Sequence, residues 1–314
     1  MPVFDRAAFV ERACQSVLTQ TFRDFELIIV DDGSRDDSPR RLEALARTDP
    51  RVRLSLRENR GLIASRNELL SLARAPLIAW MDSDDISLPQ RLELQVARME
   101  ADPSLVCLGS AVREIDTDGD PIFQHIFPSD HDAIRVGLLE GSAMRFPTTM
   151  MRRQAAIDVG GFREPFKVGE DLDLFLRLME VGTLANLPQI LLLYRQHPES
   201  ISGLLADGWV TYRDTILSLA EERRLTGSDR LQRGEPVTLT FPPSRKGAPA
   251  AAWNNHRQWA DQALAGGYPA TARKHALEAL RLAPRQLACW KTGARVVLGT
   301  SRLNPLSWPA AKRG

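Results

Sequence analysis

Two acidic clusters in the first hundred residues each follow a short apolar run. Asp31 and Asp32 come directly after FELIIV at residues 25–30, and Asp82-Ser83-Asp84-Asp85 follows LIAWM at residues 77–81. Such runs are typical of strands that are buried on both faces. Ligands of open α/β sheets bind beyond the carboxyl ends of the strands. If these two strands are parallel neighbours, both clusters face one crevice.

The chemistry open to these carboxylates is metal binding and nucleotide binding. Mg²⁺ takes oxygen ligands, commonly one or two carboxylates together with substrate phosphates, so Asp82 and Asp84 could hold a cation that neutralises a diphosphate leaving group. Asp31 and Asp32 could accept hydrogen bonds from the base or ribose of a nucleotide. Both clusters could also be plain turns, because Asp, Gly and Ser are common turn residues.

The elements around the clusters alternate between strand and helix patterns. This alternation predicts an α/β fold with a mixed, mostly parallel sheet flanked by helices. Strands are expected at residues 25–30, 52–56, 77–81, 106–115, 121–127 and 190–194. Helices are expected at residues 9–18, 63–73 and 170–181, and from about residues 38 and 90. A hairpin turn is expected at residues 116–120, which read DTDGD.

The composition changes after about residue 203. Residues 233–250 are rich in Pro and Gly and are expected to form a linker, and residues 251–300 resemble one helix pair of the tetratricopeptide type. We therefore expect a main domain at 1–203, a helix and linker at 204–250, and a small all-α tail at 251–314. The tail has 10 Lys or Arg against 2 Asp or Glu. This surplus suits either a solvated helical surface or peripheral contact with an anionic membrane or lipid phosphate.

Several other classes of protein are disfavoured by the sequence. The three cysteines are scattered and form no CxxC pair, so a cytoplasmic protein without disulfides is expected. No Gly-rich dinucleotide turn, P-loop or G-x-S-x-G sequence is present. The aromatic residues of the tail suit helix packing better than nucleic-acid binding, so no nucleic-acid partner is expected.

Seven segments in order give residues 2–203 a clear family resemblance. They are Pro2-Val3-Phe4, residues 16–22, residues 26–34, Ser65-Arg66-Asn67, residues 82–85, Gly169-Glu170-Asp171 and Tyr194-Arg195-Gln196-His197. This part of the chain resembles family 2 of the inverting glycosyltransferases, which have the GT-A nucleotide-sugar fold. The tail resembles appendages of bacterial members and is far less diagnostic.

The resemblance implies a role for each matching residue. It places Asp171 as the catalytic base, and Asp84, with Asp82 and His197, around a divalent metal, either Mn²⁺ or Mg²⁺. On the nucleotide side it places Pro2, Phe4, Asp31, Asp32, Arg66 and Asp82. Supporting positions are Ser83, Asp85, Glu170 and Arg195. On the residues alone, Asp171 could equally be an acid favoured by a helix N-terminus, His197 a loop histidine and Arg66 a helix-surface charge.

The expected activity is metal-dependent, inverting transfer of a sugar from a nucleotide-diphosphate donor, a UDP-sugar first of all. The resemblance implies a glycan or lipid-linked acceptor, as in bacterial cell-surface polysaccharide synthesis, and a protein that is cytoplasmic or peripheral at the inner membrane surface. Family members begin with a whole strand before the segment that Pro2 opens, so the first strand is expected to be truncated here. Asp5 stands where Asn is common. A non-catalytic member that binds a nucleotide sugar or a partner is the alternative.

Overall fold

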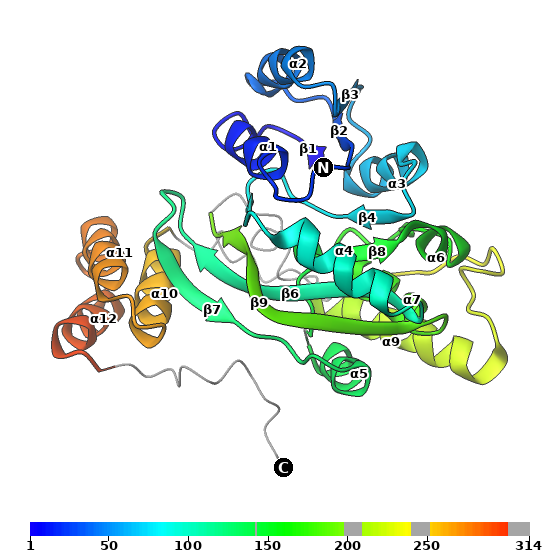
Figure 1. Ribbon diagram of the computed structural model, residues 1–314. Coiled ribbons are helices and arrows are strands. Elements are labelled where there is room, and N and C mark those ends of the chain that lie inside the picture. Colours follow the sequence, from blue (N-terminus) through cyan, green and yellow to red (C-terminus); the bar gives the residue numbers. More distant parts are fainter. Residues whose placement is uncertain (142, 198–208, 240–251, 301–314) are drawn as a thin grey trace. The chain divides into compact units, whose positions relative to one another are not determined.

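The computed structural model describes residues 1–141, 143–197, 209–239 and 252–300 (Figure 1). Contacts divide the chain into two units, each with its own core. The first unit contains residues 1–111, 126–192 and 209–239, and the second contains residues 112–125, 193–197 and 252–300. None of the helices in these residues is both long enough and apolar enough to span a bilayer.

The first unit opens with a parallel three-stranded sheet, blue in Figure 1. Its strands, in spatial order, are β1 (Pro2–Val3), β2 (Leu27–Asp31) and β3 (Val52–Leu56). The helices that follow them are α1 (Val10–Leu18), α2 (Ser38–Thr48) and α3 (Leu62–Leu72). α2 has proline in its first turn, where the ring needs no hydrogen-bond donor. The predicted strand–helix alternation is therefore present.

A second sheet has the order β4-β8-β6-β9-β5, and β7 pairs with β6. The strands are β4 (Leu77–Ala79), β5 (Ile86–Ser87), β6 (Leu105–Ile115), β7 (Pro121–His125), β8 (Met150–Arg152) and β9 (Thr183–Arg195). The pairs β4–β8, β6–β8 and β6–β7 are antiparallel. The expected mixed sheets are present, but β2 and β4 lie in different sheets and are not the parallel neighbours considered above.

The remaining helices of the first unit cover its core. They are α4 (Arg91–Ala101), α5 (His131–Glu140), α6 (Arg153–Asp158), α7 (Glu170–Leu178) and α9 (Trp209–Thr226), with a short 3-10 turn η1 (Phe146–Thr148). α9 packs against α7 and buries Tyr212, Ile216 and Leu219 in the same cluster as the α7 side chains. The predicted domain boundary near residue 203 stays a prediction.

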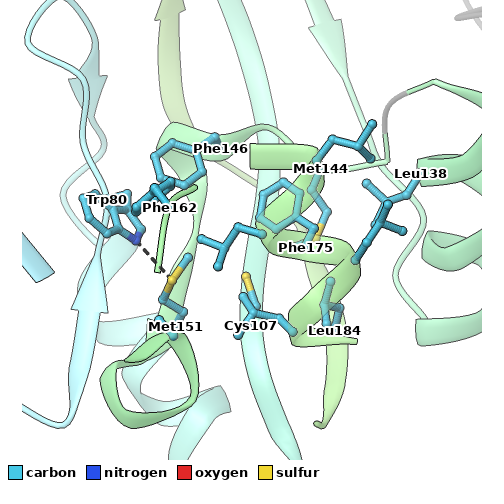
Figure 2. Packing of buried hydrophobic residues seen from close by; sticks show 14 of the residues in the cluster. Trp80, Cys107, Leu138, Met144, Phe146, Met151, Phe162, Phe175 and Leu184 are labelled. Atoms are coloured by element: carbon cyan, nitrogen blue, oxygen red, sulfur yellow. Dashed lines mark hydrogen bonds between the residues drawn. The ribbon is translucent and has the colours of Figure 1, made fainter. Parts of the chain in front are cut away.

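Trp80, two residues before Asp82 in the chain, belongs to an aromatic cluster that is drawn in Figure 2. Trp80 meets Phe146 at a ring-centroid distance of 5.3 Å and Phe162 edge-on at 5.2 Å. The indole Nε1 of Trp80 donates to Sδ of Met151 at 3.2 Å (Figure 2). Because these rings are buried and interlocked, the chain has a rigid support where it leaves β4 for Asp82.

The second unit joins the β6–β7 hairpin to three helices. They are α10 (Ala252–Ala265), α11 (Pro269–Leu282) and α12 (Leu287–Leu298). Small alanine side chains let α10 and α11 approach closely, and Ile122 and Phe123 of β7 pack into the same cluster as Trp259. Within this unit the helical tail thus shares a core with the hairpin, which is residues 112–125 of the expected main domain.

Candidate active site

In the turn after β2, one carboxylate oxygen of Asp31 has no hydrogen-bond partner among the described residues. Asp31 is buried, and its Oδ1 accepts a hydrogen bond from the backbone N–H of Ser34 at 2.9 Å. Its Oδ2 is also buried but has no hydrogen-bond partner among the described residues. Gly33 makes this turn with φ +78°, and a Cβ there would lie 2.7 Å from the backbone nitrogen of Asn59. A buried, unpaired carboxylate oxygen is costly, so Asp31 is suited to accept a donor from a ligand.

Asp32 is used differently, although it is the next residue. Its Oδ1 accepts from the N–H of Arg60 at 2.9 Å, and its Oδ2 accepts from the N–H of Gly61 at 2.7 Å. The guanidinium of Arg57 lies 2.8 Å from Oδ1. Both oxygens of Asp32 are therefore occupied by the chain, and they hold the loop that leads into α3. Arg57 was not identified from the sequence, where the only signal is a basic residue just after β3.

The second acidic segment alternates between open and buried side chains. Asp82 and Asp84 keep 30% and 18% of their side chains exposed, whereas Ser83 and Asp85 are buried. Asp85 lies near the buried Arg91, whose pKa burial lowers to about 10 while Asp85 and Asp82 oppose that change. Asp82 and Asp84 are therefore partly exposed, whereas Ser83 and Asp85 lie inside the protein.

Asp82 and Asp84 fit a divalent cation. Burial raises the pKa of Asp82; Arg66 opposes this, whereas Asp84 and Asp171 add to it. Arg6 lies on the other side, with its Nε 3.3 Å from Oδ2 of Asp84. Two partly open carboxylates that repel one another are the oxygen ligands that Mg²⁺ and Mn²⁺ accept, and a bound cation would relieve the repulsion.

The strands that precede the two acidic segments lie in different sheets. The loop after β1 contacts both segments and so connects them. Arg6 binds Asp84, and its backbone N–H donates to Oγ of Ser38 at 3.0 Å. Asp5 donates its N–H to Oγ of Ser34 at 2.8 Å. Asp5 has φ +50°, a left-handed conformation that Asn and Asp tolerate best, so either residue suits this position. Arg6 was also missed from the sequence. Pro2 lies buried in β1, whereas Phe4 is exposed.

Arg66 is a buried side chain and not the helix-surface charge considered above. It lies on α3 with its Cζ 4.1 Å from the ring centroid of Phe146 and 5.4 Å from that of Phe162. Its Nη1 forms an ion pair with Oε1 of Glu170, and its Nη2 lies 3.9 Å from Oδ1 of Asp82. Arg66 therefore brings the second acidic segment and the start of α7 to one point.

The first turn of α7 holds three acids with different surroundings. Gly169 precedes the helix with φ +78°. Burial raises the pKa of Glu170 to about 7; Arg66 opposes this and Asp171 adds to it. Asp173 is fully buried and bound by Arg163 and Arg177. Asp171 is only half-buried, and its Oδ1 accepts from the N–H of Leu172 at 2.8 Å. Of the three, Asp171 has the surroundings of a base that can reach a substrate.

Arg195 and His197 belong to the second unit, and both are buried. Nη1 of Arg195 donates to the backbone oxygens of Asp116 and Thr117, each at 2.9 Å. Arg195 thus holds the hairpin turn, and its supporting role at the donor site stays a prediction. The metal role of His197 stays a prediction.

A second Asp-x-Asp cluster lies at the tip of the β6–β7 hairpin. Ligand atoms of Asp116, Asp118 and Asp120 lie within 4.8 Å of one another. The Nζ of Lys274 lies 2.6, 2.6 and 2.7 Å from their Oδ2 atoms in turn, and Nε2 of His275 lies 3.1 Å from Asp116. One ammonium group lies within 2.7 Å of all three carboxylates, at the centre where a cation would bind. The arginines beside Asp84 and Asp82 lie at 3.3 and 3.9 Å and each contacts one of the two carboxylates, so the hairpin cluster is the poorer metal site.

Comparison with known proteins points to one family. The model of the family described as Glycosyl transferase family 2 matches residues 1–160. An Escherichia coli chondroitin synthase is 30% identical over 190 residues, which are 60% of this chain but 27% of the synthase. The O-antigen biosynthesis glycosyltransferase WbnJ of Escherichia coli is 33% identical over 196 residues, which cover 61% of this chain and 76% of that protein.

Solved structures agree in fold. Staphylococcus aureus TarS 1–349 in complex with UDP-GlcNAc has a TM-score of 0.56 at 16% identity, covering 96% of this chain and 91% of that one. The mannosyltransferase PcManGT from Pyrobaculum calidifontis, in complex with GDP-Man and Mn²⁺, has a TM-score of 0.51 at 19% identity, covering 95% and 79%. At these identities the likeness extends to the fold alone, which is the expected GT-A fold.

Proposed function

The chain belongs to glycosyl transferase family 2, and from that premise we propose that it transfers a sugar from a nucleotide-diphosphate donor to an acceptor hydroxyl with inversion at the anomeric carbon. The observation that carries the proposal is the position of Arg66. Its guanidinium reaches Asp82 in the acidic segment and Glu170 beside Asp171, so a donor-binding group and a candidate base lie around one side chain.

Carboxylates of both acidic segments bind the donor in this proposal. Asp31 accepts a hydrogen bond from the nucleoside through its unpaired Oδ2, and Asp32 acts indirectly by holding the loop at Gly61. Asp82 and Asp84 would hold Mn²⁺ or Mg²⁺, which supplies charge neutralisation to the departing diphosphate. A UDP-sugar is the first donor to test, since the neighbouring structures hold UDP-GlcNAc and GDP-Man.

The acceptor side of the proposal depends on Asp171. Its carboxylate takes the proton of the acceptor hydroxyl while that oxygen attacks the anomeric carbon. Attack on the face opposite the leaving diphosphate forms the new glycosidic bond as the old bond breaks, so the configuration inverts. The enzyme needs no covalent intermediate, and Asp171 keeps the proton until solvent removes it.

We assign the product to a cell-surface polysaccharide, because relatives such as WbnJ are named for O-antigen synthesis. A growing glycan or a lipid-linked sugar would be the acceptor, met at the cytoplasmic face of the membrane. One face of α12 suits contact with that membrane: Leu287, Trp290, Val297 and Leu298 are 56–83% exposed. Three basic residues, Arg257, Lys291 and Arg295, line a cavity of about 430 Å³ between α10 and α12. Apolar side chains beside cations are the pattern of an interfacial helix.

The proposal is tested by Asp171→Asn with Asp132→Asn as the matched control. Asp132 is likewise an acid in the first turn of a helix, but it is exposed and lies on α5. We expect Asp171→Asn to lower kcat at least about 10²-fold, the lower range for loss of a general base, with UDP affinity unchanged. Asp132→Asn should retain both. Full activity of Asp171→Asn, or a product with retained configuration, would contradict the mechanism. A wild-type chain that binds UDP-sugars without transfer would favour the non-catalytic alternative.

A further inference from the structure

The buried charge of Arg66 needs compensation from the protein. The side chain is 5% exposed and stacks against Phe146 with 4.1 Å between its Cζ and the ring centroid. Figure 2 shows that ring packed with Trp80 and Phe162. A guanidinium in such an apolar setting is stable only when acidic partners surround it. Nη1 and Nη2 have these partners in Glu170 and Asp82.

The partners of Arg66 come from two segments that carry opposite sides of the proposed reaction. Asp82 is the first residue of the acidic segment that follows β4. Glu170 is the first residue of α7 and precedes Asp171. Burial raises the pKa values of both Asp82 and Glu170; Arg66 opposes this change in each, and Asp171 adds to it in each. Asp171 therefore repels both carboxylates, and Arg66 is the cation that Asp82 and Glu170 share.

We propose that Arg66 and Glu170 form a positioning pair that fixes the first turn of α7, and so holds Asp171 at a set place beside Asp82 and Asp84. The inference rests on the proposed function and deepens it. Arg66 then acts through Glu170 and is not a ligand of the nucleotide. The buried Nε of Arg66 has no hydrogen-bond partner in the described part of the chain. Direct contact of Arg66 with the donor is therefore the competing explanation that the experiment must distinguish.

Lysine is a poor replacement at position 66. A planar guanidinium can lie against Phe146 and offer separate nitrogens to Glu170 and Asp82, whereas an ammonium is a single strongly hydrated point charge. Glutamine at position 170 keeps the shape of Glu170 but loses its charge. Arg66→Lys therefore keeps the positive charge but changes the geometry of the pair, whereas Glu170→Gln keeps the geometry but removes the negative charge.

The test is a double-mutant cycle of Arg66→Gln, Glu170→Gln and the two combined, read by kcat and by UDP affinity in the full chain. We expect each single variant to lower kcat about 10²-fold, the loss that a 1 Å misplacement can cause, with UDP affinity within about threefold of wild type. The combined variant should be no slower than the slower single variant, because both changes remove one interaction. Arg66→Lys should not restore kcat.

The matched control is Arg53→Gln, which removes another arginine–glutamate ion pair, 2.5 Å long, to Glu26 in the first sheet. It should leave kcat unchanged. A loss of UDP affinity that follows the loss of kcat in Arg66→Gln, or kcat effects that multiply in the combined variant, would overturn the positioning role. If Arg66→Gln does not fold, kcat and UDP affinity are measured for Glu170→Gln and Arg66→Lys at equal folded fraction. Both variants should have a lower kcat with UDP affinity kept, and an unchanged kcat in both would overturn the positioning role. A wild-type chain without transfer activity would overturn the proposed function first, and the inference with it.

Discussion

Lys274 places its ammonium nitrogen 2.6 Å from Oδ2 of Asp116, a side chain with no exposed surface. Oδ1 of Asp116 accepts the N–H groups of Asp118, Gly119 and Asp120 at 2.8–3.0 Å. Burial raises the pKa of Asp116, but hydrogen bonds from His275 and Lys274 outweigh it, so the pKa lies well below its usual range. The hairpin and α11 are therefore joined by a charged contact within the second unit.

Removal of that ammonium should destabilise the second unit. We expect Lys274→Ala to lower the free energy of unfolding by about 1–2 kcal/mol, because Asp116 keeps a buried charge with fewer partners; the exposed part of Lys274 keeps the loss modest. Lys291→Ala is the control, since Lys291 makes no ion pair among the described residues, and it should change stability by less than about 0.5 kcal/mol. Denaturant titration at pH 7 measures both.

The same contact has a defined pH dependence. The pKa of Asp116 is lowered in the folded state, so its contribution is present above the unfolded value of about 3.9 and is lost as pH falls further. The stability gap between wild type and Lys274→Ala should thus narrow at acid pH. A gap that widens below pH 4 would contradict this assignment of the charge.

Metal binding should distinguish the two acidic clusters. We expect Asp84→Ala to abolish the Mn²⁺-dependent rise in thermal stability with UDP, because Asp82 and Asp84 are the partly exposed carboxylates that we propose as metal ligands. Asp118→Ala should keep that rise, since Asp118 already faces Lys274. The rise itself is about 2.7 kcal/mol at a hundredfold excess over Kd. The opposite pattern would move the metal site to the hairpin.

Substitution of Asp31 should affect UDP affinity, whereas substitution of Asp32 should affect the stability of the fold. Asp31→Asn should lower UDP affinity about tenfold, equal to about 1.4 kcal/mol, and leave stability nearly unchanged, since one oxygen of Asp31 has no partner among the described residues. Asp32→Asn should cost about 1.5–3 kcal/mol of stability, because charge-assisted bonds to Gly61, Arg60 and Arg57 are weakened. Calorimetric titration with UDP and thermal unfolding measure the two. If the two variants change UDP affinity and stability to the same extent, the different roles of Asp31 and Asp32 would be refuted.

Glu170 should make stability fall between about pH 4.5 and 7. Its pKa rises from 4.5 to about 7 in the folded state, so the folded chain holds a proton there that the unfolded chain has lost. Stability falls with rising pH wherever the folded state binds more protons. Relative to Glu170→Gln, which cannot titrate at this position, wild type should lose stability across this range and level off above it. A constant difference from pH 4 to 8 would argue against the raised pKa.

The exposed face of α12 should bind anionic bilayers. Trp290→Ser with Leu298→Ser should weaken co-sedimentation with phosphatidylglycerol vesicles about tenfold, because two apolar side chains no longer leave water. Val210→Ser on α9 is the control, because Val210 is 60% exposed but lies in the first unit. Equal binding of wild type to neutral phosphatidylcholine vesicles would argue against the role of the basic residues.

The sequence by itself determined the local elements and the places where chemistry could occur. β3 begins and ends where its apolar pattern predicts, and α2 begins at Ser38 as expected. The hairpin at Asp116 is present as well. These features depend on neighbours within a few residues, namely the spacing of apolar side chains and the turn preferences of Asp and Gly. The order of seven short segments was sufficient for the family.

Only the tertiary structure decided what each charged residue contacts. Arg66 meets Glu170 across 104 positions of sequence, and Lys274 meets Asp116 across 158. Asp31 and Asp32 are alike in sequence, yet the loop at Gly61 binds both oxygens of Asp32, whereas Oδ2 of Asp31 has no hydrogen-bond partner among the described residues. The sequence pattern also suggested that β2 and β4 could be neighbours, and the structure separates them into two sheets. Long-range partners are selected by packing and by the cost of leaving a buried charge unpaired, and neither is encoded in local spacing.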